Sequence, residues 1–139
     1  MVTLFDALYG AVVAGSRAGL DVVVDVGHHD DYSRPLGVLP KVAASLRELP
    51  AYFVGVRCPV AVIMERRDAG GDGSPYVGSG PGGTVPDVVH RWERAVHDPG
   101  IYDLQVDTSS NSAAACAEAI TQRLREGPPV AFAALAARR

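Results

Sequence analysis

The feature that most limits the possible folds of this chain is a β-branched segment that directly follows a helical pattern of apolar residues. Residues 3–18 carry apolar side chains at helical spacing, and a glycine follows them. Residues 21–26 (DVVVDV) then form an apolar run without alternation, which is typical of a strand buried on both faces of a parallel sheet. This order predicts an α/β fold. The first helix is expected to pack through a face formed by Leu4, Leu8, Ala11 and Val12.

The same alternation of helix and strand continues along the chain. Strand patterns occupy residues 51–57 and 102–106. Three strands separated by helices predict a parallel sheet with helices on both faces, a three-layer α/β/α architecture that binds ligands at the C-terminal ends of its strands. Helical patterns occupy residues 39–49, 59–67 and 86–96, and a last helix to about Arg125 that Asn111 or Ser112 is expected to cap.

The length of the chain suits one domain. We therefore predict a single domain over residues 1–139. Residues 68–86 are rich in Gly and Pro and have few apolar side chains, which predicts a surface loop that acts as a lid. The tail, residues 128–139, is apolar enough for a docked helix but fits a frayed end equally well.

Charge and residue usage exclude several classes of function. The net charge is -3 with no basic block, whereas nucleic-acid binding needs clustered Lys and Arg. No apolar run approaches the roughly 20 residues of a membrane span, and the N-terminus lacks the basic start of a signal peptide. Two cysteines without CxxC spacing indicate neither a disulfide framework nor a zinc site. We therefore expect a cytoplasmic protein with no nucleic-acid or membrane partner.

Acidic and imidazole side chains gather where the first strand pattern ends. Asp25 matches the strand-end carboxylate that holds or orients Mg²⁺ in nucleotide kinases, but it also fits a polar residue that closes a strand. His28, His29 and Asp31 follow in a polar loop. Adjacent residues rarely point at one ion, so we predict no dedicated metal site. A substrate-facing loop and a plain solvated turn both fit these residue types better.

Four arginines flank the Gly/Pro-rich segment. Arg66 and Arg67 end the helix before it, and Arg91 and Arg94 lie on the helix after it. A guanidinium is permanently charged and presents a fixed fork of donors, so arginines on a lid can stabilise charge on a transferring phosphoryl group. Solvated helix ends are the alternative, because arginine is favourable near a helix C-terminus. The order of the surrounding elements favours the lid.

The chain contains no P-loop motif. Such a loop needs glycines for close approach to phosphate and a lysine for the β- and γ-phosphates, in the order GxxxxGK followed by Ser or Thr. The only lysine, Lys41, follows Pro40 and has Gly37 as its nearest glycine. The Gly-rich residues 70–83 carry no basic side chain. No segment of these 139 residues therefore matches the loop that holds the phosphates of ATP.

Three ordered segments resemble the chloramphenicol phosphotransferase-like family, P-loop kinases that phosphorylate a hydroxyl group of a small molecule. Together they cover nearly the whole chain. The resemblance implies a P-loop kinase-like fold, ATP and Mg²⁺ as cofactors, and a small hydroxylated molecule as acceptor. The segments are ALYGAVVAGSRAGLDVVVDVGHHD, YFVGVRCPVAVIMERRD and VVHRWERAVHDPGIYDLQVDTS.

The resemblance also implies roles for particular residues. It makes Asp25 the strand-end acid and Arg66 and Arg67 the catalytic arginines beside the lid. The glycine-rich residues 70–83 depart from the shorter, more charged lid of the chloramphenicol enzyme, so the resemblance does not carry over that substrate. The residues that it implies near the nucleotide are Arg91, Arg94, Asp107 and Thr108.

Compared with the family, the chain resembles an N-terminally truncated, partial P-loop kinase-like domain. The family's first strand, its Walker A loop, the helix after that loop and an early Asp base have no counterpart here. In that fold the first strand lies between the strands that match residues 21–26 and 51–57, so we expect an empty slot in the sheet. Unpaired strand edges are costly, and we expect marginal folding unless the strands close up or self-association pairs them. The chain is expected to be inactive alone.

Two other functions fit parts of the sequence. A non-catalytic remnant could bind a partner or ligand through residues 27–35 and the lid, which is consistent with the missing phosphate-binding lysine. A metal-dependent hydrolase could use His28, His29 and Asp31.

Overall fold

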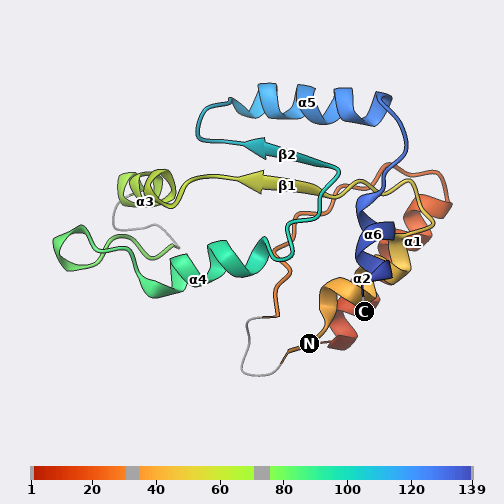
Figure 1. Cartoon of the computed structure of the whole chain (residues 1–139), viewed down its shortest axis with the longest axis horizontal. Helices are drawn as coiled ribbons and strands as arrows, with labels where there is room; N and C mark the ends of the chain where they lie inside the picture. The colour runs from red at the N-terminus through yellow and green to blue at the C-terminus, as the bar shows by residue number, and fades with distance from the viewer. Residues whose placement is uncertain (1, 31–34, 71–75, 139) are drawn as a thin grey trace.

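The structure is a computed structural model that describes residues 2–30, 35–70 and 76–138. Helices surround a small sheet and also form a separate cluster at one end of the molecule (Figure 1). No helix in this part of the chain is long and apolar enough to cross a membrane. In chain order the elements are α1 (Val2–Arg17), α2 (Val38–Leu46), β1 (Val54–Arg57), α3 (Val60–Ala69), the 3₁₀ turn η1 (Pro81–Gly83), α4 (Asp87–Val96), β2 (Leu104–Asp107), α5 (Ala113–Arg125) and α6 (Ala131–Ala137).

The sheet consists of two parallel strands. β1 and β2 pair in a register that places Val54 opposite Leu104 and Arg57 opposite Asp107. α5 begins at the predicted cap, because the Ser112 hydroxyl accepts a hydrogen bond from the Ala115 N–H at 3.2 Å. α5 lies beside β2 and α4 lies on the side of β1, while the carboxyl ends of both strands point towards α3 (Figure 1).

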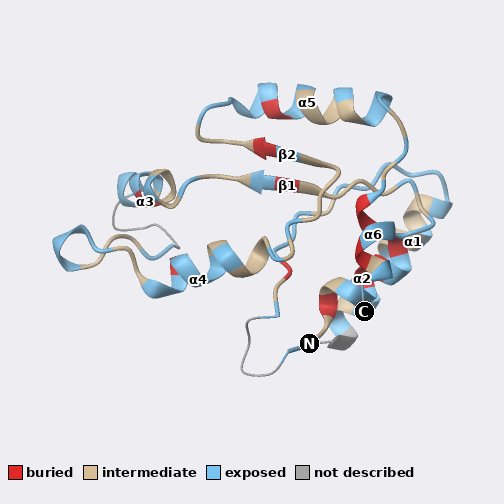
Figure 2. Ribbon diagram, in the orientation of Figure 1, coloured by how far each residue is buried: buried red, intermediate tan, exposed pale blue. Residues whose placement is uncertain are grey.

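Most buried apolar side chains lie in the helical cluster rather than at the sheet (Figure 2). α2 packs between α1 and α6, and this contact places the tail of the chain in a docked helix rather than a frayed end. The helical cluster is therefore the main core of the described residues. Its buried members are Tyr9, Val38, Val42, Ala43, Leu46, Phe132 and Leu135.

A buried carboxylate joins the helical cluster to the sheet. The side chain of Asp103 is 0% exposed and precedes β2. It accepts hydrogen bonds from the backbone N–H groups of Phe53 at 2.9 Å, Val130 at 2.6 Å and Ala131 at 3.1 Å. It also forms an ion pair with Arg123 at 3.7 Å. One side chain thus connects the segment before β1, the start of β2, α5 and the start of α6.

Residues 21–26 do not form the predicted strand. They are extended without a ladder partner, and the Val23 side chain is 97% exposed. A β-branched run favours extended backbone, but only a neighbouring strand can turn it into sheet. The described residues therefore form a mixed α/β fold with a two-stranded parallel sheet, and the three-layer architecture is not confirmed.

The packing face of α1 also differs from the prediction. Of the predicted face only Val12 packs against the helical cluster, whereas Leu4 is 72% exposed and Leu8 is exposed too. Tyr9 is buried instead, and Phe5 packs against the same cluster. The apolar residues of α1 extend round more than one face, so helical spacing alone does not decide which face meets α2.

We expect Asp103→Ala to lower the free energy of unfolding by about 3 kcal/mol or more, because it leaves three backbone N–H groups without their acceptor and removes the ion-pair partner of Arg123. Asp103→Asn keeps one oxygen as a hydrogen-bond acceptor, so it is expected to lower the free energy of unfolding by less than Asp103→Ala does. Urea denaturation measures both. Glu48→Ala, which removes an exposed partner of Arg47, is the control and should change little. Equal midpoints for Asp103→Ala and the unaltered chain would contradict the role of this carboxylate.

Candidate functional site

Arg66 lies at the carboxyl ends of both strands. From α3 its Nη2 donates to the Thr108 carbonyl oxygen at 2.6 Å, and its Nη1 donates to the Thr108 hydroxyl at 3.4 Å. Nη1 also lies 3.7 Å from the Cys58 sulfur, directly after β1. Thr108 is itself tied to β1, since its N–H donates to the Arg57 carbonyl oxygen at 2.9 Å. A permanent positive charge is thus held where parallel sheets bind ligands.

The turn after β2 completes this edge. The Asp107 carboxylate accepts from the Ser109 N–H at 2.7 Å and from the Ser109 hydroxyl at 2.6 Å. These two hydrogen bonds, followed by the nearby Arg66 charge, hold the pKa of Asp107 below its usual value. Asn111 donates to the Asp107 carbonyl oxygen at 2.9 Å. The predicted residues Arg66, Asp107 and Thr108 therefore lie together, and their roles stay predictions.

Arg67 contacts the lid instead of the sheet edge. Its Nη1 donates to the Val77 carbonyl oxygen at 3.3 Å, and its guanidinium lies 5.5 Å from the centre of the Tyr76 ring. The next residue, Asp68, accepts from the Ser79 N–H at 2.7 Å and from the Ser79 hydroxyl at 2.6 Å. These bonds lower the pKa of Asp68. α3 therefore holds the far end of the lid through two side chains. Lid residues 71–75 lie outside the described residues.

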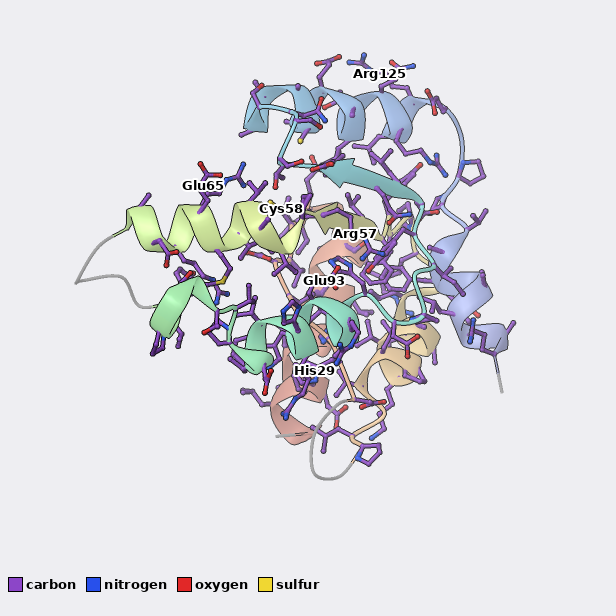
Figure 3. The ribbon with its side chains drawn as sticks, turned by 60° about the vertical axis from the view of Figure 1, so that its left-hand side comes forward. His29, Arg57, Cys58, Glu65, Glu93 and Arg125 are labelled. Atoms are coloured by element: carbon purple, nitrogen blue, oxygen red, sulfur yellow. The ribbon has the colours of Figure 1, made fainter. Side chains whose placement is uncertain are left out.

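A second charged network, which the sequence analysis missed, docks α4 on the sheet. Arg57 of β1 pairs with Glu93 of α4 at 3.7 Å and donates to the Gln105 side chain at 3.0 Å (Figure 3). The Tyr102 hydroxyl lies 2.8 Å from Nδ1 of His97 at the end of α4. Burial, and then the Arg57 charge, lower the pKa of His97, and Glu93 opposes them. The only feature of the sequence that pointed to this network was Arg57, a charged residue at the end of the β1 segment.

Arg94, one of the two remaining predicted nucleotide residues, is not joined to this edge within the described residues. Arg91 and Arg94 lie on exposed positions of α4. In the described part of the chain, no hydrogen bond or ion pair links Arg94 to Asp107 or Thr108. Asp25 is exposed in the extended segment without a strand, so it is not the end of a buried strand as predicted. The order of the elements in the sequence did not reveal that Arg94 and Asp25 lie apart from the Asp107 turn.

The two predicted histidines have different surroundings. His28 is buried against α1, where its Nε2 meets the Tyr9 hydroxyl and its ring meets the edge of Phe5. Burial, and then the neighbouring His29, lower the pKa of His28. Burial likewise raises the pKa of Tyr9 to about 12.

Both histidines also line a hollow of about 220 Å³, to which Asp30, Asp98 and Arg138 contribute charge. The hollow thus gathers polar groups from the segment before α2, the end of α4 and the end of α6. Asp31, the third predicted substrate residue, lies outside the described residues. Within the described residues no three His, Cys, Asp or Glu side chains gather as metal ligands. The hypothesis of a metal-dependent hydrolase stays untested, because it includes Asp31.

The buried His28 makes stability depend on pH. Its pKa is lowered in the folded chain, so the unfolded chain binds a proton first, near pH 6.5. We expect stability from this group to be complete above about pH 6.5 and to fall as the pH drops towards the lowered pKa, by at most about 1.4 kcal/mol per pH unit.

Urea denaturation at pH 7.5 and 5.5 checks this dependence. His28→Gln keeps a polar partner for Tyr9 but does not titrate, so its loss of stability at pH 5.5 should be smaller. Tyr9→Phe keeps the buried histidine and should keep the dependence. An identical pH dependence for His28→Gln and the unaltered chain would count against this explanation.

Comparison with known proteins identifies a family. A family model described as chloramphenicol phosphotransferase-like protein matches residues 1–125. No curated protein and no solved structure matches significantly. The family match spans far more than half of the 139 residues and includes both strands, α3, the lid and α4. The chain therefore belongs to the chloramphenicol phosphotransferase-like family.

Proposed function

We propose that the edge formed by Arg66, Asp107 and Thr108 serves the transfer of a phosphoryl group from ATP to a hydroxyl group of a small molecule. Family membership indicates a phosphotransferase-type function. The observation that carries the proposal is the Arg66 guanidinium, which Thr108 holds at the carboxyl ends of both strands. Among the described residues its contacts use Nη1 and Nη2, so the Nε–H remains to donate to an anion.

The residues of this chain do not by themselves fit the triphosphate of ATP. The only lysine, Lys41, lines a hollow between α1 and α2 instead of the sheet edge. The Gly-rich lid has no basic residue over 70–83, and no GxxxxGK motif occurs in the sequence. We therefore propose that these 139 residues bind ATP, and act as a kinase, only together with a phosphate-binding loop that they do not contain.

In this proposal the protein's own residues position charge and exclude solvent. Arg66 places a fixed positive charge beside the developing phosphoryl charge, while Arg67 and Asp68 hold the lid. The hollow beside His28 and His29 holds the acceptor, because it combines polar groups with apolar walls such as Leu39 and Leu135.

The proposal predicts no ATP binding by the 139-residue chain. Calorimetry with ATP and Mg²⁺ should give no heat of binding, whereas the chain preceded by a family segment with a Walker A loop should bind. In that longer protein, Arg66→Ala is expected to lower kcat about 100-fold or more, and Arg66→Lys to restore only part of it.

Two results would overturn the proposal. ATP binding by the short chain would mean that other residues hold the phosphates. Inactivity of the longer protein on a broad panel of hydroxylated compounds would remove the kinase function itself.

A non-catalytic binding protein is the second candidate. The missing phosphate-binding lysine and the two hollows lined by helices favour it. The activity panel with the longer protein separates the candidates, because a binding protein stays without kinase activity when the Walker A segment is added.

We also propose that the chain associates with itself through the sheet. In the described residues β1 has a ladder partner on one side only, and the nearby extended segment exposes Val22 and Val23. Val23→Lys places a charge on this segment and is expected to shift sedimentation towards the monomer. Ala44→Lys adds the same charge to the exposed face of α2 and should not shift it. Equal effects of the two changes would mean that net charge, rather than this segment, controls association.

A further inference from the structure

A second hollow, separate from both the sheet edge and the histidine hollow, lies between α1 and α2. It measures about 370 Å³, which is within the range of small-molecule sites. Tyr9, Val38 and Val42 line it and are buried members of the helical cluster. Because these residues are fixed by the main core, the walls exist before any ligand arrives.

Gly10 keeps this hollow open. It lies on the α1 wall, and apart from its chain neighbours and the backbone of its own helix no atom lies within 4 Å of the position that a Cβ would occupy. Its φ is not positive, so its backbone does not require glycine. Alanine would also favour the helix by about 1 kcal/mol. The glycine thus contributes space rather than backbone geometry.

Opposite charges face the hollow from its two walls. Asp6 lies on the α1 wall, and Lys41, the only lysine of the chain, lies on the α2 wall. The ion pairs of the described residues join neither side chain to the other or to a third group. A ligand that carries both an ammonium and a carboxylate could therefore pair with both walls at once.

The size of the hollow favours a small molecule over a protein partner. Its α1 wall runs from Phe5 to Val13, about 12 Å along a helix. A stable protein interface needs roughly 800 Å² from each partner, far more than two helical turns provide. An aromatic ring or branched chain instead suits the floor, which Phe5 and Tyr9 share with three valines.

We propose that the hollow between α1 and α2 binds a small zwitterion with an apolar body, of which an aromatic α-amino acid is the simplest form. The ammonium pairs with Asp6, the carboxylate pairs with Lys41, and the side chain lies on the apolar floor. This site does not depend on ATP or on phosphoryl transfer.

Titration by nuclear magnetic resonance, with L-phenylalanine as the probe and the 139-residue chain as the protein, tests the site. Saturable shifts at millimolar concentration are expected for residues of α1 and α2. N-acetyl-L-phenylalanine lacks the ammonium and L-phenylalaninamide lacks the carboxylate, so each should bind about tenfold more weakly or worse. Equal affinity for all three probes would overturn the zwitterion, and no binding of any probe would overturn the site.

Variants locate the binding in the hollow. Gly10→Leu fills the space and should abolish binding. The midpoint of its urea denaturation shows whether the fold is kept. Gly10→Ala should bind L-phenylalanine more weakly than the unaltered chain. Lys41→Gln should remove the preference for L-phenylalanine over its amide, and Asp6→Asn the preference over the N-acetyl form. Unchanged binding by a folded Gly10→Leu variant would show that the ligand binds elsewhere and would refute the proposal.

Discussion

The buried Asp103 carboxylate joins the two parts of this molecule. Its two oxygens accept from the N–H groups of Phe53, Val130 and Ala131, so the segment before β1 and the start of α6 are fixed to the start of β2. The stacked rings of Phe53 and Phe132, 5.0 Å apart, lie in the same region. β2 spans only four residues from this point to the Asp107 turn. The position of the sheet edge relative to the helical cluster therefore depends on Asp103.

The sheet edge is organised by polar contacts more than by apolar burial. Arg66 donates hydrogen bonds to Thr108, Asp107 accepts hydrogen bonds from Ser109, and the Arg57–Glu93 pair docks α4. Partly exposed ion pairs contribute about 0–1 kcal/mol each. The helical cluster, in contrast, holds most of the buried apolar side chains. Local opening should thus involve α3, the lid and α4 before it involves α1, α2 and α6.

Features that depend on neighbouring residues in the sequence were predicted correctly, whereas features that depend on contacts between distant segments were missed. The Ser112 cap, the helix after Pro59 and the two strands that pair were all readable from neighbouring residues. Residues 21–26 have the composition of a strand but no ladder partner, because composition cannot specify which strand is adjacent. The packing face of α1 was misjudged for a similar reason, since its partner α2 decides which side is buried.

The same limit applied to the candidate site. Arg66 and Thr108, chosen on separate grounds, do meet at the carboxyl ends of the strands. Parallel strands with their following helices make that meeting predictable. Arg57 belongs to no recognisable sequence motif. Its role in docking α4 on the sheet became visible only through its ion pair with Glu93. Asp25 was assigned through a strand that did not form, so its predicted position failed with that strand.

The two adjacent arginines of α3 show how one helix serves two structures. Consecutive helical residues point about 100° apart, so Arg66 and Arg67 cannot approach the same group from the same side. Arg66 reaches the sheet edge, and Arg67 reaches the lid backbone at Val77. Asp68 adds a second lid contact through Ser79. The contacts of Arg67 and Asp68 with residues 77 and 79 are therefore separate from the contacts that hold the positive charge of Arg66 beside the strands.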